Sequence, residues 1–395
     1  MNKNLIQSQS KGVKVLSLFD GMSCGMIAML KAGIDIVQYD AYEIDKYAIK
    51  TSQHNFPQIL HHGDVFEADF KIYEGIDYLI GGSPCTYWSI AQKNNRETQA
   101  EGLGWELFQQ YVRALNEAKP KFFIYENNKS MSKEIRKSID NAFGFEAVHI
   151  NSALVSAQNR QRLYWVGRKT PNGSYVRVDI SQPKDRGIIL KDILDSKTYG
   201  DDEQASNSPV KLGEVGNGGQ GNRIYSINGK SVAQTANSGG IGSNTGLYAE
   251  PIESTVRIGA LPRPNGELST SQAMRIYSIN GKSVNLTSCG GGLGGKTGLY
   301  ACPIYTDNSS GHNDKIYNVY EVKDGFITIK GKKYPIKLSD GYYIIRKLTV
   351  SECKRLQTVP EWYEFPVSDA QAYKMLGNGW TCDVIQYLIE NTLFF

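Results

Sequence analysis

Several classes of protein are excluded by what this sequence of 395 residues lacks. No apolar run approaches the roughly 20 residues that span a bilayer, so we expect no membrane partner. The polar stretch before Val13 does not resemble a signal peptide. The formal net charge is only +4, with 44 Lys and Arg against 40 Asp and Glu, which is too small to indicate nucleic-acid binding on its own. Any basic surface must therefore be local.

Metal-ligand spacings are also missing. The six cysteines are scattered along the chain, at Cys24, Cys85, Cys289, Cys302, Cys353 and Cys382. No two of them form a CxxC pair, and the five histidines show no ligand spacing either. The sequence therefore predicts reduced cysteines in a cytoplasmic protein, with neither a disulfide framework nor a metal site.

The first part of the chain contains an alternation of strand and helix patterns. Compact apolar stretches predict strands at residues 13–19, 36–43, 76–80, 121–125 and 161–167. Helical spacing lies between them, at residues 26–32, 45–54 and 103–118. Strands that alternate with helices favour a doubly wound, mostly parallel sheet of the α/β class.

The composition changes after about residue 170, where Gly, Ser and Asn become dense and helical periodicity disappears. Turn dipeptides such as Asn228-Gly229 separate short strand patterns in this region. A chain of this length is expected to form one large domain and a smaller one. We therefore predict an α/β domain at residues 1–170, completed by 341–395, and a smaller β-rich domain at 171–340.

An internal duplication lies inside the β-rich region. The ten residues RIYSINGKSV at 223–232 recur unchanged at 275–284. Residues 223–252 and 275–304 are identical at 21 of 30 positions, which chance does not produce. The two copies extend over about 209–253 and 255–304, and two copies are too few for a solenoid.

A candidate cofactor site lies at the ends of the first two predicted strands. Gly21 and Gly25 follow the first strand in a turn that permits close backbone approach of a nucleotide-like ligand. Glu43 follows the second strand 18 residues after Gly25, near the spacing expected of a carboxylate that binds ribose. A plain strand–turn–helix with an exposed acid is equally compatible with these residues.

Three further motifs carry groups suited to covalent chemistry. Cys85 follows a buried strand on a loop stiffened by Pro84, a position suited to a nucleophile, although a lone cysteine is more often structural. Glu126 ends the next strand, where a carboxylate either hydrogen-bonds a ring nitrogen or lies solvated. Arg160 and Arg162 share one face of an extended segment, which suits phosphate or carbonyl binding as well as an exposed basic strand start.

The motifs and their order along the sequence resemble those of the cytosine-5 DNA methyltransferases of bacteria and phages over nearly the whole chain. The matching motifs are Phe19-Asp20-Gly21 with Gly25, Glu43, Gly63-Asp64-Val65, Ser83-Pro84-Cys85, Glu126-Asn127-Asn128, Gln158-x-Arg160-x-Arg162, Arg346-Lys347-Leu348-Thr349 with Glu352 and Arg355-Leu356-Gln357, and Gly377-Asn378-Gly379. The family usually has Gln where this chain has Thr86, Val where it has Asn128, and a glycine within Ser23-Cys24. None of these departures removes a group that performs chemistry.

The resemblance implies an S-adenosylmethionine-dependent methyltransferase of Rossmann-like fold, with the β-rich region as a target recognition domain. In it, Cys85 adds to carbon 6 of a flipped cytosine and Glu126 holds and protonates ring nitrogen 3. Arg162 contacts the carbonyl oxygen at carbon 2, and Arg160 supports the loop. S-adenosylmethionine is the methyl donor and no metal takes part. The implied cofactor-binding residues are Phe19, Asp20, Gly21, Gly25, Glu43, Asp64, Val65, Pro84, Leu107 and Asn378.

The implied partner is double-stranded DNA, bound by a monomer that does not physically require a cognate restriction endonuclease. The implied role is restriction–modification or phage self-protection. The resemblance also suggests that the two copies are tandem recognition modules, with the variable residues 233–238 and 285–290 contacting bases.

Three alternatives stay open. A tRNA cytosine methyltransferase shares the catalytic motifs, although the long β-rich region argues for duplex DNA. A non-catalytic DNA-binding homologue is disfavoured by the intact Cys85, Glu126 and Arg162. The duplicated region is, in the third alternative, merely a structural β-module.

Overall fold

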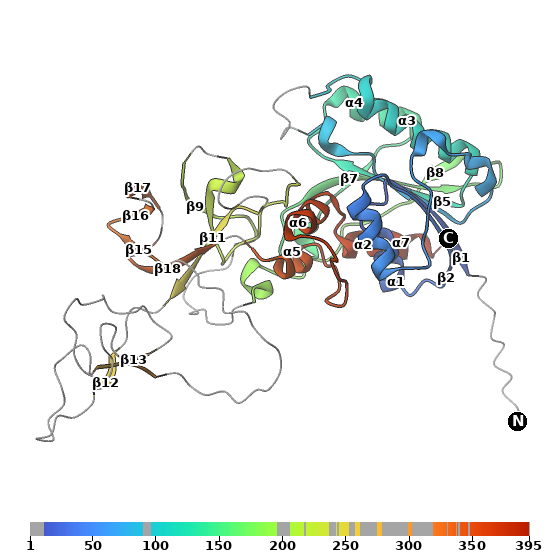
Figure 1. Cartoon of the computed structure of the whole chain (residues 1–395). Coiled ribbons are helices and arrows are strands. Elements are labelled where there is room, and N and C mark those ends of the chain that lie inside the picture. Colours follow the sequence, from blue (N-terminus) through green and yellow to red (C-terminus); the bar gives the residue numbers. More distant parts are fainter. Residues whose placement is uncertain are drawn as a thin grey trace, which may run out of the picture. The chain divides into compact units, whose positions relative to one another are not determined.

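The computed structural model contains two compact units, which are drawn in Figure 1. It describes residues 12–89, 96–195, 206–216, 219–236, 242, 245–252, 257–260, 275–278, 299–301, 319–329, 331–336, 338, 340–346 and 348–394. The first unit consists of Met1–Ile193, Lys230–Asn237 and Thr349–Phe395, and the second of Leu194–Gly229 and Ser238–Leu348. Of the helices in the described ranges, none combines the length and the apolar character needed to cross a membrane.

The first unit is built on one eight-stranded sheet. Its strands are β1 (Val13–Leu18), β2 (Ile36–Tyr42), β3 (Leu60–His61), β4 (Tyr78–Gly81), β5 (Phe122–Asn128), β6 (Val148–Asn151), β7 (Gln161–Lys169) and β8 (Tyr175–Arg177). They lie in the order β3-β2-β1-β4-β5-β7-β6, and β8 pairs with β7 outside this path. The strands β1 to β5 pair in parallel, whereas β7 runs antiparallel to its neighbours. The predicted doubly wound, mostly parallel α/β sheet is therefore confirmed, and its strand ends meet at one edge.

Helices cover both faces of this sheet. They are α1 (Cys24–Lys31), α2 (Lys46–Asn55), α3 (Gly102–Ala118), α4 (Lys133–Phe143), α5 (Val350–Leu356), α6 (Asp369–Asn378) and α7 (Cys382–Thr392). In Figure 1, α3 and α4 lie above the sheet, and α1, α2 and α7 lie below it. Local signals set several helix starts: the Asp45 side chain accepts from the backbone N–H of Tyr47, and Thr349 forms a capping box with Glu352.

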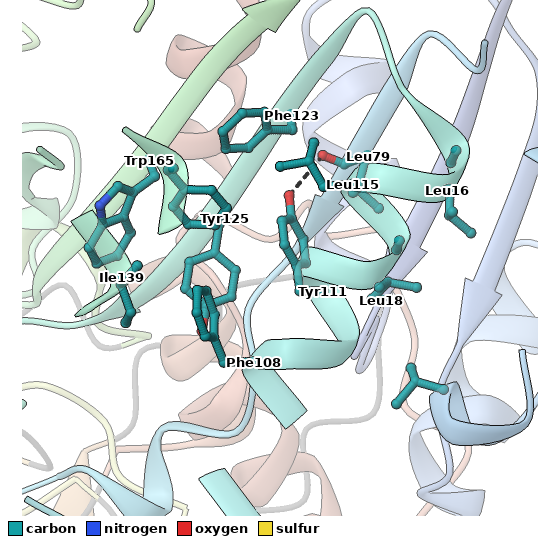
Figure 2. Packing of buried hydrophobic residues seen from close by; sticks show 14 of the residues in the cluster. Leu16, Leu18, Leu79, Phe108, Tyr111, Leu115, Phe123, Tyr125, Ile139 and Trp165 are labelled. Atoms are coloured by element: carbon teal, nitrogen blue, oxygen red, sulfur yellow. Dashed lines mark hydrogen bonds between the residues drawn. The ribbon is translucent and has the colours of Figure 1, made fainter. Parts of the chain in front are cut away.

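An aromatic core fixes the two central strands that end at the candidate site. Figure 2 shows Tyr111 projecting from α3 toward the sheet, with its hydroxyl directed at the backbone of Leu79 in β4. This hydroxyl lies 3.1 Å from the oxygen of Leu79 and 2.9 Å from that of Ile124 in β5. Tyr111 is fully buried and its ring packs against Tyr125, with centroids 4.8 Å apart. One side chain thus ties α3 to both strands and holds their ends in register.

The C-terminal segment lies in the same unit as the first strands. The hydroxyls of Tyr78 in β4 and Thr392 in α7 lie 2.6 Å apart, and the Tyr363 hydroxyl donates to the oxygen of Met22 at 2.7 Å. Both contacts join residues more than 300 positions apart in the sequence. The loop after α6 is thereby brought to the sheet edge that carries the candidate site.

The second unit contains two sheets. The larger one has the order β17-β16-β15-β18-β11-β10-β9 and the smaller one β12-β13-β14. The strands are β9 (Lys211–Glu214), β10 (Arg223–Ser226), β11 (Leu247–Ile252), β12 (Arg257–Ala260), β13 (Arg275–Ser278), β14 (Leu299–Ala301), β15 (Val319–Lys323), β16 (Phe326–Ile329), β17 (Lys332–Pro335) and β18 (Gly341–Arg346). In each copy of the repeat the middle strand pairs antiparallel with the strand before it and parallel with the strand after it. The duplicated sequence therefore forms a duplicated three-strand arrangement.

The unit boundaries differ from those expected from composition. The first unit continues to Ile193 rather than residue 170, because β8 pairs with β7 and the backbone N–H of Arg186 donates to the oxygen of Leu154 at 2.9 Å. The segment Lys230–Asn237, taken from the middle of the first repeat copy, also belongs to the first unit. Nothing in the composition of the repeat indicates this return.

Candidate active site

Two asparagines of β5 hold the loop that carries Cys85. The loop follows β4 and turns into a short 3-10 helix, Cys85–Tyr87, in which Cys85 is partly exposed. Asn127 donates its amide N–H to the Ser83 backbone oxygen at 3.2 Å, and Asn128 donates to the Cys85 backbone oxygen at 3.1 Å. Asn128, one of the departures from the family pattern, therefore anchors the backbone of the predicted nucleophile.

The Glu126 carboxylate is held at both oxygens. Arg162 lies with Nε 3.0 Å from Oε1, and Trp380 donates its indole N–H to Oε2 at 2.9 Å. Glu126 is only 8% exposed, so both contacts are shielded from water and strengthened accordingly. A Cβ at Gly82 would lie 3.0 Å from Oε2 and 2.7 Å from the Glu126 backbone oxygen, so glycine makes room for this carboxylate.

Trp380 was missed by the sequence reasoning. It directly follows the motif Gly377-Asn378-Gly379, and that position was the available signal. The loop after α6 delivers it from 254 positions away in the sequence. No local pattern reports a contact across that separation.

The two arginines of the predicted basic motif have different surroundings. Arg162 reaches Glu126 because β5 and β7 pair with Asn128 opposite Arg162. Arg160 is only 3% exposed and donates to three backbone oxygens: those of Gln234 (3.2 Å), Gly377 (3.0 Å) and Gly379 (2.9 Å). Burial lowers the pKa of Arg160 to about 10, so its guanidinium remains charged at neutral pH, and it interacts electrostatically with Glu126 and Cys85.

A cavity of about 370 Å³ opens beside these groups. Its lining residues are Asn128, Lys129, Ser130, Gln161 and Arg162. The cavity thus lies between the polar end of β5 and the start of β7. Arg162, the ion-pair partner of Glu126, is one of its lining residues.

The turn after β1 fits the nucleoside part of a cofactor. Gly21 has a positive φ of 59° with open space where a Cβ would lie, and its N–H donates to Glu43 Oε2 at 2.8 Å. Burial raises the pKa of the Glu43 carboxyl, which also accepts the backbone N–H groups of Ile44 and Asp45. Phe19 has φ 57°, a strained conformation for a non-glycine residue, and such residues are enriched at functional sites.

Two other predicted cofactor residues, Asp20 and Gly25, have structural roles in the turn after β1. The Asp20 carboxylate accepts from the hydroxyls of Ser17, Ser23 and Tyr39, which orients the turn itself. A Cβ at Gly25 would lie 2.3 Å from the Ile80 side chain, so packing against β4 requires this glycine.

Five predicted positions remain. Asp64 caps the short helix Val65–Glu67, Val65 is buried in the core, and Leu107 packs against that core. Pro84 is exposed in the loop that follows β4, and Asn378 is exposed at the C-terminal end of α6. The turn at Gly21, the carboxylate of Glu43 and the ring of Phe19 lie at one edge of the sheet, and this combination fits S-adenosylmethionine.

The expectation that residues 233–238 contact bases is wrong for Gln234. This side chain is 4% exposed, and its amide N–H donates to the backbone oxygen of Cys353 in α5 at 3.1 Å. It is a packing residue of the first unit. Residues 237 and 238 and the counterpart stretch 285–290 lie outside the described residues.

Comparison with known proteins assigns a family to this arrangement. A family model for C-5 cytosine-specific DNA methylases matches residues 13–393. The chain is 26% identical over 451 aligned residues to the orphan methyltransferase M.SPRI of Bacillus phage SPR, with 96% of this chain and 97% of that protein covered. It is 29% identical over 350 residues to the orphan methyltransferase M.Rho11sI of Bacillus phage rho11s, covering 71% and 68%. A solved structure of the Entamoeba histolytica methyltransferase EhMeth matches at a TM-score of 0.54 and 14% identity, over 97% of this chain and 98% of that one, which supports the fold alone.

Proposed function

The chain belongs to the C-5 cytosine-specific DNA methylase family, and from that premise we propose that it methylates carbon 5 of a flipped-out cytosine in a specific double-stranded DNA sequence. The observation that carries this proposal is the Glu126 carboxylate, fixed between Arg162 and Trp380 beside the loop of Cys85. The resemblance assigns the catalytic roles to Cys85, Glu126 and Arg162, with Arg160 in support.

Covalent activation of the base explains why these groups lie together. Carbon 5 of cytosine is a poor nucleophile, and the stacked base must first leave the duplex at a cost of a few kcal/mol. The Cys85 thiolate then forms a bond to carbon 6, and the displaced electron pair raises the electron density at carbon 5. Glu126 enters this step protonated, hydrogen-bonds ring nitrogen 3 and gives it that proton as Cys85 adds, while Arg162 stabilises the resulting carboxylate and contacts the carbonyl oxygen at carbon 2.

The final steps restore the thiolate. Phe19, Glu43 and the other residues at the ends of β1 and β2 would hold S-adenosylmethionine, which would supply the methyl group that carbon 5 accepts. Water then takes the carbon 5 proton, the electron pair of that C–H bond re-forms the double bond between carbons 5 and 6, and Cys85 leaves carbon 6 as the thiolate. The proton on ring nitrogen 3 returns to Glu126. Arg160 acts at a distance, by holding the backbone of Gly377 and Gly379 just before Trp380.

We assign target recognition to the second unit, with its two repeat copies as tandem modules. We propose that the protein acts on DNA as a monomer, without a physically attached endonuclease. The biological role that we propose is restriction–modification or phage self-protection. The test is bisulfite sequencing of plasmid DNA from cells expressing the chain or its Cys85→Ser variant. We expect methylated cytosines within one or a few sequence contexts for the wild-type chain alone.

Two results would contradict this proposal. Unmodified plasmid DNA together with modified cytosines in tRNA would assign the enzyme to RNA. Unmodified DNA and RNA, with DNA still bound by the purified protein, would support a non-catalytic binding role.

A further inference from the structure

The first repeat copy enters the first unit through a buried lysine. Lys230 has no exposed surface. Its ammonium group donates to three backbone oxygens: those of Ala153 (2.8 Å), Ser156 (3.2 Å) and Ile188. A buried charge is tolerated only where such hydrogen bonds replace its water. The three carbonyls therefore form a specific receptor for a lysine side chain.

The residues after Lys230 bind the same surface mainly through their backbone. Ser231 pairs with Gln158 in a parallel bridge: its N–H donates to Ala157 at 2.6 Å, and its oxygen accepts from Asn159 at 2.8 Å. Arg160 donates to the backbone oxygen of Gln234, and a Cβ at Gly377 would lie 2.7 Å from the Ala236 nitrogen. We call this surface of the first unit, formed by residues 153–160, Ile188, Cys353 and Gly377, the dock.

The second repeat copy carries the same docking sequence. Lys282-Ser283-Val284 stands where the first copy has Lys230-Ser231-Val232, and the seven residues before it are identical in both copies. Contacts made by the lysine or by backbone groups do not distinguish the copies. The side chain of Gln234 does distinguish them, because the second copy has Leu286 at the corresponding position, and Ala233 and Ala236 are replaced there by Asn285 and Ser288.

The strands around the docking sequence are equivalent as well. In the first copy, β11 lies between β10 and β18, with five residue pairs from Tyr248–Arg346 to Ile252–Tyr342. In the second copy, β14 pairs with β13 in the register that β11 uses with β10. Among the described strands, β13 is the only partner of β14, so β14 has the same edge that β11 offers to β18. Both copies also continue with Pro and Ile, at 251–252 and at 303–304.

We propose that the dock is shared between the two copies, so that Lys282 and the residues after it replace Lys230 and its followers, with β14 taking the place of β11 beside β18. Residues 302–318 connect β14 to β15, and a stretch of that length reaches up to about 56 Å when fully extended, at about 3.3 Å per residue, so β14 can be brought beside β18. This inference deepens the proposed function, on which its meaning for target recognition rests. The enzyme then offers one catalytic centre to two recognition modules in turn.

The difference between the copies sets which one is favoured. Leu286 cannot donate the hydrogen bond that Gln234 makes to the Cys353 oxygen. One net hydrogen bond corresponds to roughly a three- to tenfold difference in occupancy, so the first copy is the usual occupant. The proposal therefore predicts a minor population with the second copy docked.

A disulfide competition measures this population without using methylation. Residues that pair across adjacent strands lie within disulfide range, so Gln158→Cys and Ser231→Cys should oxidise to a cross-link when the first copy is docked. Adding Ser283→Cys offers the thiol at position 158 a second partner, and peptide mass spectrometry gives the ratio of the two cross-links. We expect the 158–231 product to exceed the 158–283 product by roughly three- to tenfold.

Three further variants of the chain that carries the introduced cysteines at 158, 231 and 283 test whether the dock is shared. Lys230→Met should make the 158–283 product dominant, whereas the matched Lys282→Met should abolish it and leave the 158–231 product unchanged. Leu286→Gln, which supplies the missing amide, should raise the 158–283 share severalfold without removing any group. Amide hydrogen exchange gives a second measurement, made on the chain without the introduced cysteines. When Lys230→Met is added to that chain, protection should move from residues 230–236 to residues 282–288.

The absence of the 158–283 product in the Lys230→Met and Leu286→Gln variants, with the 158–231 product formed in the parent, would overturn the shared dock. An equal 158–283 yield with and without Lys282→Met would show nonspecific collision and overturn it as well. Both readouts are independent of activity. A failure of the shared dock is therefore distinguishable from a failure of the proposed methylation, which bisulfite sequencing detects.

Discussion

Replacing Trp380 by phenylalanine tests how far the chemistry depends on holding the Glu126 carboxylate at both oxygens. The indole N–H donates to Oε2 at 2.9 Å, while Arg162 occupies Oε1 at 3.0 Å. A hydrogen bond to a charged group contributes about 1.5–3 kcal/mol, and Glu126 is only 8% exposed, so water replaces the lost donor poorly. At about 1.4 kcal/mol for each tenfold change in rate, Trp380→Phe should lower kcat about 10- to 100-fold.

Transfer of labelled methyl groups to a DNA duplex, followed in steady state, separates kcat from KM. We expect KM for S-adenosylmethionine to stay near its wild-type value, because the lost bond is made to Glu126. Trp362→Phe is the matched control, since that indole is 55% exposed and its ring packs edge-on against Phe56. An exposed substitution of this kind should change neither kcat nor thermal stability appreciably.

A wild-type kcat in the Trp380→Phe enzyme would refute this reasoning and would show that Arg162 alone orients Glu126. A lower kcat that coincides with a large fall in the unfolding temperature would instead assign Trp380 a role in the packing of the loop after α6. Measuring both quantities on the same preparations distinguishes these results.

Three other substitutions probe the site. Cys85→Ser should abolish methyl transfer while calorimetry still detects S-adenosylmethionine binding, because a hydroxyl is a far weaker nucleophile at neutral pH; near-normal activity would contradict the mechanism. Asn128→Val removes the bond to the Cys85 backbone and should lower kcat by about two- to tenfold, so an unchanged kcat would mean that Asn127 suffices to hold the loop. Arg160→Lys keeps the charge but loses the planar fork that reaches three carbonyls, and should destabilise the fold by about 1–3 kcal/mol in denaturant unfolding; unaltered stability would show those bonds to be dispensable.

The first half of the sheet was predictable because its strands are short apolar runs bounded by turns. The strand expected at residues 13–19 is β1 (Val13–Leu18), and the helix expected at 103–118 is α3 (Gly102–Ala118). The prediction was less complete for β5, which continues through the polar residues Glu126-Asn127-Asn128. Their strand conformation comes from pairing with β7, and that long-range ladder overrides local composition.

The site was predictable only to the extent that motifs lie at strand ends. Cys85 and Glu126 follow or finish parallel neighbours, β4 and β5, so topology alone brings them to one edge. The spacing of the two arginines in the sequence did not predict their contacts. A shared face was expected for Arg160 and Arg162, yet Arg160 lies just before β7. Its guanidinium donates to the carbonyl oxygens of Gln234, Gly377 and Gly379, none of which is near it in sequence.

Lys230 shows why the return of the first repeat copy into the first unit escaped the sequence reasoning. After Asn228-Gly229 it has the sequence context of an exposed turn lysine, but it is fully buried against carbonyls at positions 153, 156 and 188. The duplication nevertheless contained a signal. Exposed turn residues drift freely, whereas the run of identity between the copies continues through the lysine and the two residues that follow it, and ends at positions 233 and 234. Identity through the buried lysine and the backbone bridge of Ser231, with a difference at the buried Gln234, is what two modules that fit one receptor with unequal affinity require.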